Sequence, residues 1–151
     1  MEVSELKSYD IYDGKDKVLG RLGSAVAKQL LQGKKIAIVN AEQIIISGNL
    51  PDIVHKYKTR LDLRDGADPT HSPYWSRRPD MLVKRIVRGM LPYDRKSGRN
   101  AYKQLRVFIG VPEALKDSKP IELKSKSPKT LYSWYVSVAE LTETLGYNTP
   151  T

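Results

Sequence analysis

The sequence predicts an α/β fold, because its first third changes from strand-like to helix-like periodicity and back again. Residues 9–12 form a short run with strand character that leads into an Asp-Gly turn. From residue 20 to residue 32, small and apolar side chains recur at helical spacing on one side. Residues 36–40 are an apolar, β-branched run typical of a buried strand. Strand, helix and strand in this order indicate a βαβ unit.

The next elements are a short strand, a helix and a long loop. Residues 44–48 repeat the isoleucine-rich pattern of a strand. Pro51 suits the first turn of a helix, since its fixed backbone angle is already helical, and we expect this helix to run to about Asp62. Between residues 65 and 79, one glycine and three prolines interrupt every period. We therefore expect a long, exposed basic loop there.

The clearest amphipathic helix is predicted to begin at Pro79 and to end near Gly89. Its apolar positions recur on one side, and they are Leu82, Val83, Ile86, Val87 and Met90. Its cationic positions occupy the opposite side, and they are Lys84, Arg85 and Arg88. We expect the apolar side to face the core and the cationic side to face outward.

The remaining elements are less regular. We expect, in order, a basic loop at 92–100, a further helical turn at 101–105, a strand at 106–110, an irregular linker at 116–129 and a C-terminal helix at 131–145. A chain of 151 residues is long enough for one ordinary domain with its own core. Residues 1–151 are therefore expected to form a single domain.

Positive charge is concentrated in the middle of the chain. Residues 56–106 contain 14 lysines and arginines but only 5 acidic residues, and this difference accounts for the whole net charge of +9. Such a block is typical of a protein that binds a polyanion, so nucleic acid is the first partner to consider. The alternative is a solvated charged face. Arginine outnumbers lysine in the block, which favours bidentate contacts with phosphate.

The residues predicted to contact nucleic acid come from this block. They are Lys56, Lys58, Arg60, Arg77, Arg78, Lys84, Arg85, Arg88, Arg95, Lys96, Arg99 and Lys103. Tyr74 and Trp75 lie beside two of these arginines in the sequence and are candidates for stacking on unpaired bases. The same aromatic pair could instead anchor its loop to the protein's own body.

Catalytic and metal sites lack the residues they need. The chain has no cysteine, which excludes disulfides and thiolate metal sites. The only histidines, His55 and His71, are far apart, and Asp62, Asp65 and Asp68 are as readily charge partners as metal ligands. No serine lies in a nucleophile elbow. We expect no catalytic residue, no metal, no cofactor and no small-molecule substrate.

A nucleotide-binding turn is the main alternative to a nucleic-acid interface. Gly14, Gly20 and Gly23 lie between the first predicted strand and helix. Their spacing matches neither the G-x-G-x-x-G fingerprint nor a P-loop. Small residues that allow helices to pack closely are the simpler interpretation.

The sequence also bears on location. Its longest apolar runs are too short to span a bilayer. The acidic amino terminus lacks the basic and apolar regions of a secretory signal. We therefore expect no membrane association and a cytoplasmic protein.

Four segments carry a more specific pattern. They are DGKDKVLGRLGSAVAK at 13–28, VNAEQIIISG at 39–48, RIVRGMLP at 85–92 with Gly98-Arg99 after it, and LRVFIG at 105–110. In this order they resemble the ribosomal protein L13 family, with the archaeal form as the nearest likeness. The resemblance implies a three-layer α/β/α domain with a small, largely parallel or mixed central sheet and long basic loops.

The resemblance also implies a function without catalysis. A member of this family would bind large-subunit rRNA on the cytoplasmic ribosome, contact neighbouring ribosomal proteins and support assembly of the subunit. Arg85, Arg88, Arg95 and Arg99 would then face RNA. Two alternatives remain at this point: a nucleotide-binding α/β enzyme, and a regulatory RNA-binding module that acts outside ribosomes.

Overall fold

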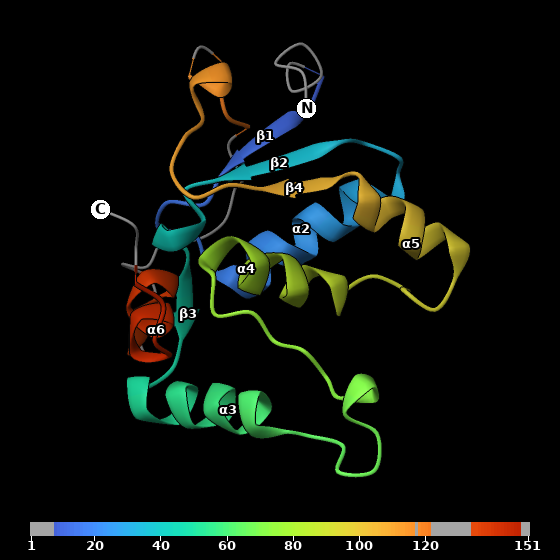
Figure 1. Cartoon of the computed structure of the whole chain (residues 1–151). Coiled ribbons are helices and arrows are strands. Elements are labelled where there is room, and N and C mark those ends of the chain that lie inside the picture. Colours follow the sequence, from blue (N-terminus) through green and yellow to red (C-terminus); the bar gives the residue numbers. More distant parts are fainter. Residues whose placement is uncertain (1–7, 117, 122–133, 149–151) are drawn as a thin grey trace.

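The structure, a computed structural model that describes residues 8–116, 118–121 and 134–148, contains a three-stranded parallel sheet (Figure 1). The strands are β1 (Asp10–Asp13), β2 (Ile36–Val39) and β4 (Leu105–Val107), with β2 in the middle. Helix α2 (Leu19–Leu31) connects β1 to β2, so the predicted βαβ unit is present. The α/β fold class is confirmed.

Both faces of this sheet are covered. In the central strand β2 all four side chains are buried, and Ile36 pairs with Asp10 of β1 and with Leu105 of β4. One face packs on α2 and on two later helices, α4 (Pro79–Arg88) and α5 (Lys96–Lys103), which lie on the same side in Figure 1. The opposite face packs against the 3₁₀ helix η3 (Glu113–Leu115) in a smaller cluster of Ile11, Ala37, Val39 and Leu115.

Helix α4 begins at Pro79, as the sequence predicts, and its apolar side joins the main core. Leu82, Val83 and Val87 are at most 1% exposed. Aliphatic side chains buried to this extent contribute roughly 1.5–3 kcal/mol each relative to exposure. With this side of α4 in the core, Lys84, Arg85 and Arg88 are left half-buried on the rest of the helix and Met81 is exposed.

Two of the three glycines of the first βα connection, Gly14 and Gly23, lie where a side chain would not fit. The N–H of Gly14 donates to the carbonyl of Val39 over 2.9 Å. A Cβ atom on Gly23 would lie 2.8 Å from Sδ of Met90, which follows α4. Gly23 therefore lets α2 approach the end of α4, in agreement with the packing interpretation, whereas a Cβ atom on Gly20 would meet nothing within 4 Å.

A second, two-stranded antiparallel sheet stands beside the first. It pairs β3 (Ile45–Ser47), which follows the 3₁₀ helix η1 (Ala41–Gln43), with β5 (Tyr135–Ser137). Helix α3 (Leu50–Asp62) follows β3, and α6 (Val138–Thr144) follows β5.

The predicted C-terminal helix at 131–145 is wrong over part of its length. Residues 135–137 are a strand, and residues 131–133 lie outside the described part of the chain. The helix begins only at Val138, because Ser137 caps it: the Ser137 Oγ accepts a hydrogen bond from the N–H of Glu140 at 3.1 Å. The prediction rested on Leu131 and Trp134, which continue the helical spacing of Val138 and Leu141 backwards. In the structure Trp134 is 79% exposed, and Val136 is buried as part of the strand.

The region around residue 98 also differs from the prediction. Helix α5 starts at Lys96 and ends at Lys103, whereas the sequence predicted a loop over 92–100 and a helical turn at 101–105. A glycine inside a helix is unfavourable on its own, so Gly98 argued for a loop. The fold needs that glycine inside the helix, because a Cβ there would overlap the carbonyl group of Pro92.

The long loop predicted at 65–79 is present up to the start of α4. Its only regular piece in the structure is the 3₁₀ helix η2 (Pro69–His71). Most of the linker predicted at 116–129 lies outside the described residues. Among the described residues, no helix has the length and apolarity needed to span a membrane.

Candidate nucleic-acid interface

The cations predicted to contact nucleic acid lie on three helices and one loop. Helix α3 carries Lys56, Lys58 and Arg60, the loop carries Arg77 and Arg78, α4 carries Lys84, Arg85 and Arg88, and α5 with its N-cap carries Arg95, Lys96, Arg99 and Lys103. Most of them are exposed. The half-buried members are Arg60, Lys84, Arg85 and Arg88.

Trp75 organises the first group of these cations. Its ring makes an edge contact with Tyr57 of α3, with 6.2 Å between ring centroids. The guanidinium carbon of Arg60 lies 4.7 Å from the Trp75 centroid, and that of Arg85 lies 5.3 Å away. The four residues, which we call the Trp75 group, therefore join α3, the long loop and α4. Trp75 is half-buried and packs against the main core, as the anchoring interpretation requires.

A second group, the Tyr102 group, consists of Lys84 and Arg88 of α4 with Tyr93 and Tyr102. The guanidinium carbon of Arg88 lies 3.8 Å from the centroid of Tyr93, and Nζ of Lys84 lies 5.2 Å from the centroid of Tyr102. The two tyrosine rings meet edge to face at 5.5 Å. This group joins α4 to α5 through Tyr102 and to the turn before α5 through Tyr93.

The two groups make α4 the link between the other basic elements. Arg85 contacts the Trp75 group, and Lys84 and Arg88 contact the Tyr102 group. The prediction that these three side chains simply face outward therefore needs correction, since each is half-buried over an aromatic ring. A guanidinium stacked in this way still presents its N–H edge to a phosphate. Lys56 and Lys58 lie outside both groups on the exposed side of α3.

Carboxylates neutralise few of these cations. Within the described residues, Arg78 is the single member of the predicted set with a carboxylate partner. Its Nε and Nη2 donate to the two carboxylate oxygens of Asp80 at 3.2 and 2.9 Å. The two residues are only two positions apart, and the pairing was not predicted from the sequence. The other cations keep their positive charge available to an external anion.

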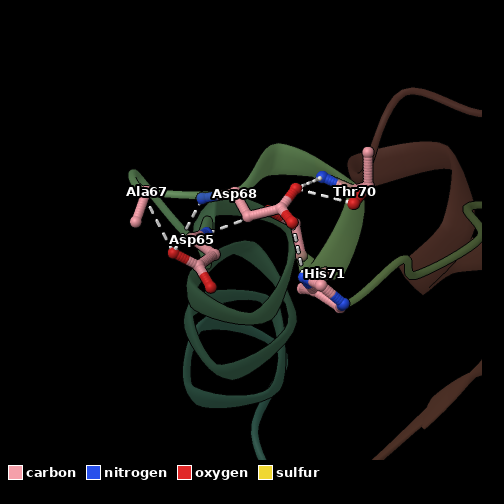
Figure 2. Close-up of polar contacts among 6 residues, drawn as sticks. Asp65, Ala67, Asp68, Thr70 and His71 are labelled. Carbon is pink, nitrogen blue, oxygen red and sulfur yellow. Dashed lines mark hydrogen bonds and ion pairs between the residues drawn. The ribbon is translucent and has the colours of Figure 1, made fainter.

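The acidic residues of the long loop shape that loop (Figure 2). The carboxylate of Asp68 accepts hydrogen bonds from the N–H and the hydroxyl of Thr70 at 2.9 and 2.6 Å, and it lies 2.7 Å from Nδ1 of His71. The bonds from Thr70 hold the pKa of the Asp68 carboxyl below its ordinary value. Asp65 accepts from the N–H groups of Ala67 and Asp68. Among the described residues, no three His, Asp or Glu side chains gather to hold a metal ion.

Lys84 has an unusual environment. Burial lowers the pKa of its ammonium group below the ordinary value, the charge of Arg106 lowers it further, and Asp80 opposes both effects. An anion close to Lys84 would raise this pKa, because it favours the charged form of the side chain.

We expect the change Tyr57→Phe to reduce the loss of stability at alkaline pH. Burial raises the pKa of the Tyr57 hydroxyl above its ordinary value of 10.0, although Arg60 opposes the shift. The folded protein therefore keeps this proton where the unfolded chain has released it. The contribution to stability is complete below pH 10.0 and is lost as the pH rises through the folded-state pKa. Urea unfolding of both proteins at increasing pH measures the effect. If the free energy of unfolding falls equally for the two proteins above pH 10.0, the prediction is wrong.

Comparison with known proteins gives a consistent result. The family model described as "Ribosomal protein L13" matches residues 7–114. The chain is 47% identical over 122 residues to a large ribosomal subunit protein uL13 of Methanosphaera stadtmanae, covering 80% of this chain and 86% of the relative. It is 38% identical over 152 residues to the uL13 protein of Natronomonas pharaonis, covering 98% of both chains. These relatives are archaeal, as the resemblance implied. The chain belongs to the ribosomal protein L13 family.

Proposed function

We propose that this chain is a non-catalytic component of the large ribosomal subunit that binds rRNA and supports assembly of the subunit in the cytoplasm. One observation carries the RNA-binding part: Arg60 of α3 and Lys84, Arg85 and Arg88 of α4 are held over aromatic rings, one of which is Tyr102 of α5. The cations of α5 itself are exposed, and within the described residues Arg78 alone among the predicted set has a carboxylate partner. Family membership supports the ribosomal part, since the relatives are named as large-subunit proteins.

The proposed mechanism is charge neutralisation on a preformed surface. Exposed cations such as Arg95, Lys96 and Arg99 would contact phosphates and release their counterions. The half-buried arginines Arg85 and Arg88 would hold fixed positions over their rings and so lose little side-chain freedom on binding. Such contacts fix position and orientation on folded RNA, and they do not read base sequence.

The test is the simultaneous replacement of Arg95, Lys96 and Arg99 by glutamine. All three are exposed, so the fold should be retained. If each neutralises one phosphate, the plot of log affinity against log salt should become shallower by about 2 to 3. Affinity is measured with large-subunit rRNA at several salt concentrations, and incorporation is measured by co-sedimentation with large subunits.

The matched control replaces Lys15, Arg21 and Lys28 by glutamine. This variant loses the same charge from exposed positions outside residues 56–106, and it should bind nearly as the wild type does. Equal salt dependence in both variants would show that α5 is not a contact surface. A regulatory module acting outside ribosomes would bind RNA but would fail to co-sediment with the subunit in near-equal amounts.

A further inference from the structure

The long loop contains a small hollow that is lined in part by a highly exposed aromatic side chain. The hollow has a volume of about 430 Å³ and is lined by Leu61, Pro73, Tyr74, Trp75, Ser76, Arg77 and Arg78. Tyr74 is 85% exposed, whereas its neighbour Trp75 is half-buried under the guanidinium groups of Arg60 and Arg85. The two aromatics that the sequence treated as a pair therefore have different environments.

The backbone around this hollow is held by its own contacts. Trp75 fixes one side to the core, and Arg78, the N-cap residue of α4, is paired with Asp80 in the first turn of that helix. The N–H of Asp65 donates to Oγ of Ser72 at 2.9 Å, closing the preceding turn. Tyr74 thus projects into solvent from a constrained loop. An aromatic ring held in this way can stack on a ligand at a low cost in ordering.

The chemistry of the lining points to an anion attached to a flat ring. The hollow has two arginines and no acidic residue in its lining. Arg78 is engaged by Asp80, while Arg77 is exposed and has no carboxylate partner among the described residues. The volume of the hollow lies in the lower part of the range for small-ligand sites. A cationic or purely apolar peptide would leave the charge of Arg77 unused.

We propose that this hollow takes one unpaired nucleotide of the bound RNA, with its base stacked on Tyr74 and its phosphate at Arg77. The inference rests on the proposed function, since it requires RNA beside this loop. It assigns base stacking to Tyr74 alone and a structural anchoring role to Trp75. A capture of this kind depends on an unstacked base, because bases within a duplex do not expose their faces.

Two RNA hairpins test the proposal directly. One carries a single bulged 2-aminopurine, and the other has the same stem without the bulge. For the bulged hairpin, Tyr74→Ala should weaken binding about 5-fold to 150-fold, the range found when one stacked base is lost. Binding of the paired hairpin should change less than about 2-fold, since only phosphate contacts remain there. Tyr74→Phe keeps the ring and should retain tight binding, and wild-type protein should change the 2-aminopurine emission.

Tyr135→Ala is the matched control, because Tyr135 is 53% exposed and lies on β5, outside the hollow. It should leave both hairpins unaffected. Equal weakening of both hairpins by Tyr74→Ala, or no weakening of either, overturns the proposal. The same holds if Tyr74→Ala leaves RNA binding intact but abolishes binding of a neighbouring protein. The glutamine variant of Arg95, Lys96 and Arg99 separates the proposed function from base stacking on Tyr74. If this variant binds both hairpins as the wild type does, the proposed function fails, whatever the effect of Tyr74→Ala.

Discussion

Gly98→Ala should destabilise the protein by about 3 kcal/mol or more, at or above the upper end of the usual cost of overpacking. A Cβ atom at this position would overlap the carbonyl group of Pro92 and lie 3.0 Å from the backbone nitrogen of Tyr93. Both obstacles are backbone, so no side chain can rotate away to relieve the overlap. Helix α5 must move as a body, and its buried Ala101 and its cations move with it.

The measurement is the free energy of unfolding in urea, followed by circular dichroism. The stability of a typical domain is only about 5–15 kcal/mol, so the variant should unfold at clearly lower urea concentrations. Gly20→Ala is the matched control, because it also lies in a helix and a Cβ there meets no atom within 4 Å. It should be neutral or stabilising by up to about 1 kcal/mol. Similar destabilisation of the two variants would rule out the backbone overlap as the cause.

Gly98 also illustrates what the sequence could and could not predict. Strand and helix order in the first half followed from periodicity and from Pro79, because local pattern and tertiary packing agree there. At Gly98 they disagree: local preference favours a loop, and the approach of α5 to Pro92 demands a helix with no side chain at that point. The strand at 135–137 is a similar case, since its partner β3 lies about ninety positions earlier.

The candidate interface, too, could be predicted only in part from the sequence. The positive charge and its location were readable from composition, and so were the aromatic residues interspersed with it. Which cation lies over which ring was not readable, because Arg60, Trp75 and Arg85 meet only through tertiary packing. For Tyr74 and Trp75 the sequence left two alternatives open, stacking on bases and anchoring the loop. Their different exposure in the structure distinguishes the two residues.

Trp75→Ala should cost about 2–3 kcal/mol of stability, somewhat less than the ~3–5 kcal/mol for a fully buried large aromatic, because this ring is half-buried. The truncation removes the edge contact with Tyr57 and the ring beneath Arg60 and Arg85. Each cation–π contact at such a site contributes about 0.5–1 kcal/mol. The long loop would lose its attachment to α3 and α4 together.

The consequence for RNA binding follows from that attachment. Without the ring, Arg85 regains rotational freedom and Arg60 keeps only its contact with the Tyr57 ring, while Tyr74 loses the fixed backbone that presents it. We expect Trp75→Ala to weaken RNA binding even under conditions where the variant is fully folded, and Trp75→Phe to recover part of both losses. The second tryptophan provides the control: Trp134 is 79% exposed, so Trp134→Ala should change stability by less than about 0.5 kcal/mol. If Trp75→Ala were as stable as Trp134→Ala, the ring would not be an anchor, and the assignment of separate roles to Tyr74 and Trp75 would lose its structural basis.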